Sequence, residues 1–340
     1  MKTGIYTNAF REFSLEEAIQ KIQSAGIQMV ELGCGEESGF AHCNPEELLK
    51  NDNRLSSFRG QIADHGLEIS ALSCHGNPVS PNEATKELSV RSMHNAVLLA
   101  EKLGLRNINC FSGCPGDWEG AGLANWVTVN WPMDYAQMYE WQWNEKLLPF
   151  WREFTAFARD HGVDRIGLEL HPGQCCYNPR SLKRLREECG PEIGVNLDFS
   201  HLLWQRMDPI LVIRELEGMI YHMHAKDIAM DWELVRKNGL INTAYFDEPR
   251  KRSWNFRSIG YGHGPEFWRN VFAELRRCGY DYVASIEMEC EVLTIPEALP
   301  KAVRFLKENL PEDIDPEEQS WQKKTHEGKM MRLKQYGLTK

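Results

Sequence analysis

Short apolar runs rich in β-branched residues alternate along this chain with longer stretches whose apolar residues recur every three or four positions. The first pattern is typical of buried strands and the second of amphipathic helices. Their alternation predicts βαβ units around a parallel sheet. The eight predicted strands are Gly4–Asn8, Met29–Leu32, Glu68–Ser73, Asn107–Phe111, Arg165–Leu170, Gly194–Asp198, Ile220–His224 and Tyr282–Glu287.

Helical spacing is clearest between these strands, and several helices run into a glycine just before the next strand, as expected of a helix C-cap. Eight strand-helix units suit a closed (β/α)₈ TIM barrel, which typically needs ~250 residues plus insertions. Two open α/β domains are an alternative, but no linker rich in Pro, Ser or charge divides the chain. We therefore expect a single barrel domain over 1–310 and a polar C-terminal tail over 311–340. The clearest helices are Leu15–Gln23, Leu88–Leu103, Leu147–His161, Pro209–Leu216 and Glu266–Cys278.

Two connections are much longer than the others, and they follow predicted strands four and seven. They run from Ser112 to about Glu145 and from Ile228 to about His263. Loops at the carboxyl ends of barrel strands build the active sites of this fold. The first loop holds five tryptophans, which could form a platform for a sugar or could simply pack the insertion: Trp118, Trp126, Trp131, Trp141 and Trp143.

The charge balance excludes several classes of partner. The 340 residues contain 39 Lys and Arg against 49 Asp and Glu, a net charge of −10 with no dense basic run, so nucleic acid is not an expected partner. No stretch approaches the ~18 apolar residues of a membrane span, and no charged-then-apolar leader opens the chain. Ten scattered cysteines without C-x-x-C pairs indicate reduced thiols. We expect a cytoplasmic protein that does not act at a membrane.

Four predicted strands end in a residue that can carry charge: Glu169, Asp198, His224 and Glu287. A carboxylate at the end of a buried strand costs several kcal/mol if it is unpaired, and a barrel would bring all four to one rim. Any one of them could be an ordinary salt-bridged strand end. Together, three carboxylates and one imidazole suit octahedral Mn²⁺, Mg²⁺ or Co²⁺ better than a tetrahedral structural zinc.

Further ionisable residues lie near the same strand ends. His171 lies two residues after Glu169 and points the same way on an extended chain, so it is a candidate general base or a group that orients a ligand carboxylate. His75 follows the third strand and could reach the rim. Lys226 could bind an anionic group or pair with a neighbouring acid. His222 is expected to face the helix layer, away from His224.

Several segments together resemble the sugar phosphate isomerase/epimerase family, the xylose isomerase-like TIM barrels, over roughly residues 1 to 308. The segments are Lys2-Thr-Gly-Ile-Tyr-Thr-Asn8, Ser73-Cys-His-Gly-Asn-Pro78, Leu168-Glu-Leu-His-Pro-Gly173, Asn196-Leu-Asp-Phe-Ser-His201, His222-Met-His-Ala-Lys-Asp227, Arg257-Ser-Ile-Gly-Tyr-Gly-His263 and Ser285-Ile-Glu-Met-Glu289.

The resemblance implies roles for individual residues. Glu169, Asp198, His224 and Glu287 match the family's metal ligands, and Glu169 and Glu287 also match its opposed acid and base. His201 and Arg257 match positions that hold substrate hydroxyls, and His75, Lys226 and His171 are our further candidates for substrate binding and catalysis. The implied chemistry is proton abstraction next to a carbonyl through an enediolate. Mn²⁺ is the expected ion, with Mg²⁺, Co²⁺ or Zn²⁺ as alternatives.

Three functions follow from this comparison. The first is a metal-dependent isomerase or epimerase of a sugar or keto-sugar, expected to be a homo-oligomer. The second is a lyase that cleaves 3-oxo-glycosides by β-elimination, like the large subunit of C-glycoside deglycosidases, and would work with a smaller partner subunit. The two long loops, which the family's small ketose epimerases lack, keep this second function open. The third is a non-catalytic sugar-binding barrel, because fold does not dictate function.

Overall fold

The computed structural model describes residues 1–312 and 320–338. Eight parallel strands close into a barrel in the order β1-β2-β3-β4-β5-β6-β7-β9, and β9 pairs with both β1 and β7. This is the predicted (β/α)₈ TIM barrel in a single domain. The barrel strands are β1 (Lys2–Tyr6), β2 (Met29–Gly33), β3 (Glu68–Ser73), β4 (Asn107–Cys110), β5 (Arg165–Glu169), β6 (Ile193–Asp198), β7 (Ile220–Met230) and β9 (Val283–Ile286).

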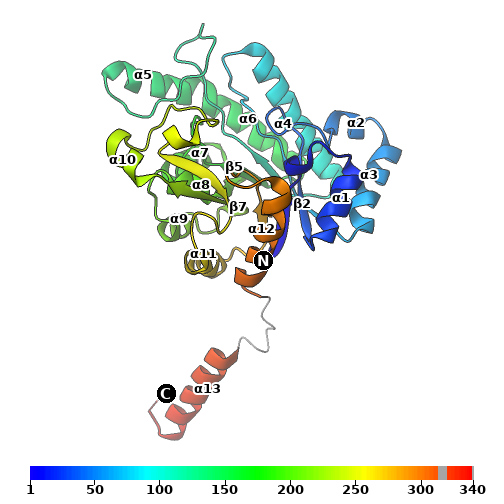
Figure 1. Ribbon diagram of the computed structural model, residues 1–340, viewed down its shortest axis with the longest axis vertical. Helices are drawn as coiled ribbons and strands as arrows, with labels where there is room; N and C mark the ends of the chain where they lie inside the picture. Colours follow the sequence, from blue (N-terminus) through cyan, green and yellow to red (C-terminus); the bar gives the residue numbers. More distant parts are fainter. Residues whose placement is uncertain (313–319, 339–340) are drawn as a thin grey trace.

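Helices surround the barrel (Figure 1). Side-chain caps fix where several begin, as in the capping box of Ser14 and Glu17 at α1. The glycines predicted to end helices, Gly26, Gly66, Gly104, Gly162 and Gly279, have φ between 70° and 79°, the left-handed region that a C-cap turn requires. The longer helices are α1 (Leu15–Ser24), α3 (Asp52–Asp64), α4 (Glu83–Leu103), α6 (Leu148–Asp160), α7 (Pro179–Cys189), α11 (Pro265–Arg277) and α12 (Ile295–Asn309), and the shorter ones are α2 (Pro45–Leu49), α8 (Phe199–Leu203) and α9 (Pro209–Glu215).

The two faces of the barrel strands differ in character. Val30 and Leu32 belong to the apolar core of the molecule, whereas Glu31, between them on β2, contacts polar side chains of β3, β4, β7 and β9 across the barrel interior. Barrel interiors are usually filled by Val, Ile and Leu. Here the interior is polar and buried, and this layer lies directly beneath the strand ends that carry the predicted site.

Both long connections have structure of their own. The loop after β4 carries α5 (Met133–Trp141) and a π-helical turn (Gln142–Leu147) that runs into α6. The seventh strand extends to Met230, beyond its predicted end at His224, and its outer half pairs antiparallel with β8 (Trp254–Ser258). β8 is not among the predicted strands. β8 lies outside the closed barrel, so the strand-helix spacing of the chain gives no indication of it. Its Trp-Asn-Phe-Arg-Ser sequence does alternate in polarity, as a strand with one buried face would. Between them lies α10 (Trp232–Asn238).

The C-terminal region begins after α12. Of the predicted polar tail over 311–340, residues 313–319 and 339–340 lie outside the described part of the chain. The helix α13 (Ser320–Gln335) stands apart from the barrel in Figure 1. None of the described helices is both long and apolar enough to cross a membrane.

Candidate metal centre and active site

The structure brings Glu169, Asp198, His224 and Glu287 together at the carboxyl end of the barrel. One ligand atom from each lies within 4.8 Å of those of the other three. Nδ1 of His224 lies 3.1 Å from Oε2 of Glu287, 3.4 Å from Oε2 of Glu169 and 3.9 Å from Oδ2 of Asp198. Strands β5 and β6 end at Glu169 and Asp198, and Glu287 directly follows β9, so the barrel itself fixes this convergence.

The carboxylates of this cluster are held in the charged form. Burial raises the pKa of Glu169, but hydrogen bonds from His201 and His75 and the charge of His224 outweigh burial and hold the pKa well below its usual range. For Asp198 the charges of Lys226 and His201 likewise outweigh burial and lower the pKa. The pKa of Glu287 is lowered despite burial by Lys226 and His224. Metal binding requires ionised carboxylates and a neutral imidazole. Burial lowers the pKa of His224, but the charges of Glu31 and Glu287 outweigh burial and raise it well above its usual range, so an ion would displace a proton from this ring.

The donor atoms fit a divalent ion. Among the described residues, Oδ2 of Asp198, Nδ1 of His224 and Oε2 of Glu287 are buried polar atoms that make no hydrogen bond of good geometry, although the two carboxylate oxygens lie within ion-pair distance of Lys226. Three ligand atoms that face one another in this way leave room in their bonding for a shared cation. Carboxylate oxygens with one imidazole nitrogen are suitable ligands for Mn²⁺, Mg²⁺ or Co²⁺.

Lys226 of β7 supplies positive charge to the cluster. Its Nζ lies 3.0 Å from Oδ2 of Asp198, 2.7 Å from Oε2 of Glu287 and 3.0 Å from Oε2 of Glu289. Burial lowers the pKa of this amine, but the surrounding carboxylates more than reverse that effect and raise the pKa well above its usual range. The structure contains the ion pair with neighbouring acids, which is one of the two roles predicted for Lys226.

Two histidines hold the carboxylate of Glu169 from opposite oxygens. Nε2 of His201 lies 2.9 Å from Oε1, and Nε2 of His75 lies 3.2 Å from Oε2. Nδ1 of His75 is in turn 3.1 Å from Oγ of Ser38. Both rings therefore orient the carboxylate of Glu169. Partners of this kind hold a carboxylate in the position that it needs to bind a metal or accept a proton.

His171 lies next to this group, with its ring centroid 4.2 Å from that of His201 and 4.9 Å from that of Phe111. Its Nδ1 lies 2.6 Å from the carbonyl oxygen of Pro172, so Nδ1 carries the proton and Nε2 is the basic atom. Burial, followed by the charge of His201, lowers the pKa of His171 to about 3. The ring is therefore neutral at pH 7.

A cavity of about 370 Å³ opens above the cluster. Its wall contains Glu169, Glu287, Lys226, His75 and His171, so most of the predicted site residues share one space. The remaining lining residues are Tyr6, Asn8, Glu37, Ser38, Phe111, Pro172, Gln174 and Glu289. Asn8, Glu37 and Gln174 were not predicted as site residues, because isolated polar residues carry no spacing signal.

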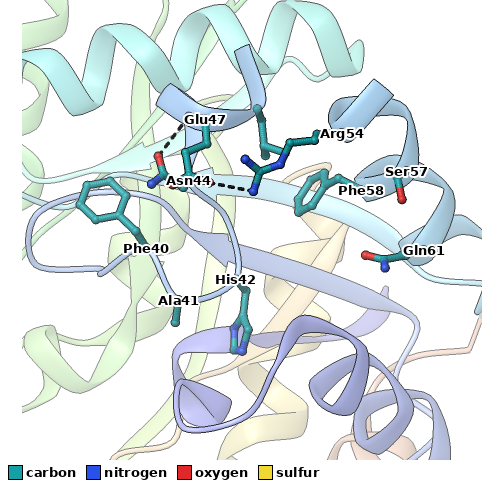
Figure 2. Close-up of a pocket in the computed structure, with 10 residues that line it drawn as sticks. Phe40, Ala41, His42, Asn44, Glu47, Arg54, Ser57, Phe58 and Gln61 are labelled. Atoms are coloured by element: carbon teal, nitrogen blue, oxygen red, sulfur yellow. Dashed lines mark hydrogen bonds and ion pairs between the residues drawn. The ribbon is translucent and has the colours of Figure 1, made fainter. Parts of the chain in front are cut away.

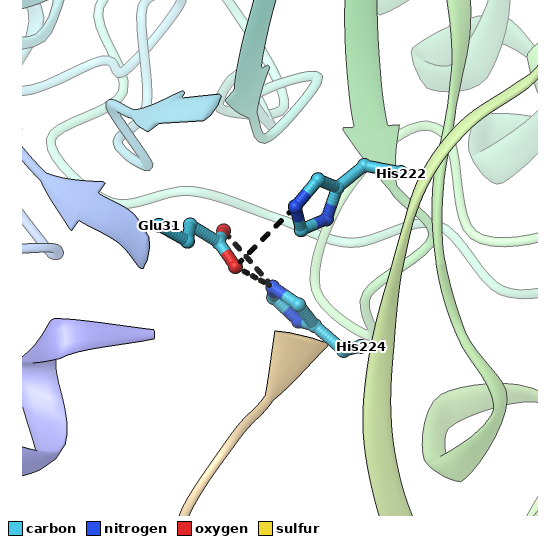
Figure 3. Close-up of side chains that lie close together, drawn as sticks. All are labelled: Glu31, His222 and His224. Carbon is cyan, nitrogen blue, oxygen red and sulfur yellow. Dashed lines mark hydrogen bonds and ion pairs between the residues drawn. The ribbon is translucent and has the colours of Figure 1, made fainter. Parts of the chain in front are cut away.

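Beneath the cluster, Glu31 of β2 and His222 of β7 face His224 inside the barrel (Figure 3). Nε2 of His224 lies 3.1 and 3.2 Å from the two oxygens of Glu31. The expectation that His222 faces the helix layer is wrong, because residues two apart on a strand point to the same side. Glu31 was not predicted as a site residue. Its charge within the apolar run Met29-Val-Glu-Leu-Gly33 could have indicated a polar contact inside the barrel.

Comparison with known proteins decides the family. A sequence profile described as Xylose isomerase-like TIM barrel matches residues 19–309. The chain belongs to this family. It is 32% identical over 313 residues to the uncharacterized protein YfiH of Bacillus subtilis strain 168, covering 91% of this chain and 99% of that protein.

Solved structures of other proteins share the fold. The probable 3-DHS dehydratase AsbF of Bacillus anthracis has a TM-score of 0.63 at 20% identity, over 90% of this chain and 99% of that one. An L-ribulose 3-epimerase has a TM-score of 0.58 at 17% identity, over 91% and 94% of the two chains. A D-psicose 3-epimerase has a TM-score of 0.55 at 14% identity, over 90% and 97%.

Two predicted substrate-binding residues of this xylose isomerase-like barrel lie outside the cavity wall. His201 is fully buried against Glu169 and Asp198, so it contacts candidate ligands where substrate contact was expected. Arg257 lies on β8, the strand outside the barrel, and its guanidinium pairs with Glu291. The strand that carries Arg257 was not foreseen, so its side chain could not be placed from the sequence.

The tryptophans of the first insertion do not cover the site. None of the five lines the cavity above the cluster; Trp118 and Trp141 line a different cavity of about 380 Å³, and Trp143 is fully buried. A further cavity, also about 380 Å³, lies between the loop 40–44 and helices α2 and α3 (Figure 2). It contains the ion pair of Arg54 and Glu47 and no member of the cluster.

Proposed function

We propose that this protein is a divalent-metal-dependent isomerase or epimerase that moves a proton next to the carbonyl of a keto-sugar. The observation that carries the proposal is the convergence of Glu169, Asp198, His224 and Glu287, with ligand atoms that face one another, at the floor of a polar cavity. We propose these four as the ligands of one ion, with Mn²⁺ as the expected metal. A bound divalent cation would supply Lewis acidity at the substrate carbonyl.

The protein's own groups would carry the proton. Glu169 and Glu287 approach His224 from different strands, and both are ionised, so each can accept a proton from carbon or return one. His201 and His75 hold Glu169 in one orientation, which limits the reorganisation needed during transfer. His171, neutral and on the cavity wall, is a second candidate to accept or relay the proton.

The charge of the cavity favours an uncharged substrate. Lys226 is the one lysine or arginine among the described residues that line it, and this amine is already engaged by three carboxylates. Five carboxylates outweigh Lys226 and a divalent ion together: Glu37, Glu169, Asp198, Glu287 and Glu289. A phosphate or carboxylate group would be repelled, so we propose a neutral, polyhydroxylated keto-sugar.

Solvent deuterium exchange tests this proposal. The full chain with Mn²⁺ is incubated in D₂O with neutral ketoses and with their phosphate esters, and carbon-bound deuterium is followed by mass spectrometry. We expect deuterium in a neutral ketose and in an isomeric product, whose mass differs from that of the substrate only by the deuterium. The absence of exchange in every neutral ketose, or faster exchange in the phosphate esters, would contradict the proposal.

The same assay separates elimination from isomerisation. A lyase acting on a 3-oxo-glycoside would release the aglycone, which a panel of such glycosides would reveal. The exposed tryptophans of the first insertion lie away from the cavity and offer no aromatic wall to an aglycone, so isomerisation is the proposal that we favour. A sugar-binding barrel would retain the ligand and exchange nothing.

Replacing His171 with Ala tests its part in proton transfer. We expect the exchange rate to fall about 10² to 10⁴-fold, the usual contribution of a general acid or base. The affinity for Mn²⁺, measured by calorimetry without substrate, should stay within a few-fold because His171 is outside the four-residue cluster. If the variant exchanges at the rate of the unmodified protein, His171 only packs against its neighbours. If the variant loses metal binding, the role of His171 is to position Glu169.

A further inference from the structure

A polar layer fills the barrel interior beneath the proposed metal site. Glu31, Ser73, Asn109 and Ser285, from β2, β3, β4 and β9, are each no more than 1% exposed. A buried carboxylate costs several kcal/mol unless it is compensated, and a barrel of this kind is ordinarily filled with aliphatic side chains. Other groups in the barrel interior must therefore compensate the burial of the Glu31 carboxylate.

Three donors from three other strands surround this carboxylate. Oε1 accepts hydrogen bonds from Oγ of Ser73 at 2.5 Å and from Nδ2 of Asn109 at 3.0 Å. Oε2 accepts one from Oγ of Ser285 at 2.6 Å. Each oxygen of Glu31 therefore accepts from a donor on another strand, which compensates the burial of this carboxylate.

Besides these three donors, the carboxylate of Glu31 contacts the ring of His224. Both carboxylate oxygens lie within 3.2 Å of Nε2, and Nδ1 of the same ring faces the three carboxylates above. Nδ2 of Asn196 also lies 3.1 Å from Nε2, but a charged carboxylate is the stronger partner and favours a proton on this nitrogen. A proton kept on Nε2 leaves Nδ1, which faces Glu169, Asp198 and Glu287, as the nitrogen that an ion would bind.

Glu31, His222 and His224 also have ligand atoms within 4.8 Å of one another, so a second ion site is the competing explanation. The hydrogen bonds argue against it. Both oxygens of Glu31 are engaged by Ser73, Asn109 and Ser285, and the two ring nitrogens of His222 lie 3.0 Å from Oδ1 of Asn196 and 3.2 Å from Oγ of Ser70. Their acceptor and donor capacity is used within the protein.

We infer that Glu31 is a positioning residue of the metal centre: it fixes the ring and the tautomer of His224 so that Nδ1 is the ligand atom, and it thereby raises the affinity for the ion. This inference rests on the proposed metal site and extends it to a layer that touches neither ion nor substrate. Carboxylates that hold metal-binding histidines in this way usually contribute 10- to 100-fold in metal affinity.

The test is Mn²⁺ binding to the full chain by titration calorimetry, without substrate, in the unmodified protein and in Glu31→Gln. Gln keeps the shape and one acceptor oxygen, but it lacks the charge and its amide nitrogen donates instead of accepting. We expect Kd to rise 10- to 100-fold. Glu192→Gln is the matched control, because Glu192 is also a buried glutamate, but it pairs with Arg159 and is not part of the cluster. It should bind Mn²⁺ as the unmodified protein does.

A second variant and a second readout guard against misfolding. Ser285→Ala removes one donor from Glu31 and should weaken Mn²⁺ binding several-fold, so it decides the question if Glu31→Gln does not fold. In the Zn²⁺-loaded protein with ¹⁵N-labelled histidine, the Nε2 proton of His224, assigned with His224→Asn, should be visible and should shift upfield in Glu31→Gln.

The outcomes separate this inference from the proposed function. Equal Kd values, within twofold, for Glu31→Gln and the unmodified protein would overturn the inference and leave the metal site intact. Two ions per chain, one of them lost in Glu31→Gln, would also overturn it, because Glu31 would then be a ligand. If the unmodified protein binds no divalent ion, the proposed metal centre fails and this inference fails with it.

Discussion

Replacing Glu287 with Gln should lower the rate of deuterium exchange into substrate about 10³-fold or more. The substitution removes a charge that lies 3.1 Å from Nδ1 of His224 and 2.7 Å from Nζ of Lys226. It also removes one of the two proposed proton carriers, and a general acid or base alone contributes about 10²- to 10⁴-fold. The measurement is exchange in D₂O with saturating Mn²⁺, together with circular dichroism to show that the variant folds.

Glu291→Gln is the matched control for this experiment. Glu291 lies four residues further along the same segment, but it pairs with Arg257 and does not line the cavity. It should keep most of the exchange activity. Unchanged exchange in Glu287→Gln would contradict both proposed roles of Glu287, whereas equal losses in the two variants would indicate that the segment after β9 was disturbed as a whole.

The fold could be predicted because its physical signals are local. Each barrel strand is a short apolar run, each helix has its own period, and glycines mark the helix ends, so all eight barrel strands and the helix α4 could be placed from the sequence. The missed strand, β8, is held by pairing with the outer half of β7 and not by a place in the barrel. Its stability comes from a partner that the sequence pattern does not reveal.

Only the part of the site that lies at the ends of strands could be predicted from the sequence. Glu169 and Asp198 end their strands, and closure of the barrel brings them to His224 and Glu287. The layer beneath depends on side chains from four strands that meet across the interior, as Glu31 meets Ser73, Asn109 and Ser285. No spacing along the chain encodes those contacts. The position of Arg257 depended in the same way on the unpredicted β8.

Replacing Lys226 with Met should make the stability of the protein depend strongly on a divalent ion. Nζ of Lys226 is buried within 3.0 Å of Asp198, Glu287 and Glu289, and removal of one partner from a buried ion pair typically costs about 3 to 5 kcal/mol. With EDTA, we expect the free energy of unfolding in urea to fall by about that amount. Mn²⁺ would restore much of the loss, because the ion provides the positive charge that the carboxylates then lack.

The decisive quantity is therefore the gain in unfolding free energy on adding Mn²⁺, which should be larger in Lys226→Met than in the unmodified protein. Lys183→Met is the control: its ion pair with Glu215 is on the surface, so its loss should change stability by no more than about 1 kcal/mol and should not alter the gain from Mn²⁺. An equal gain in Lys226→Met and the unmodified protein would mean that the amine and the ion do not share these carboxylates, and the cluster would then need a different cation or none.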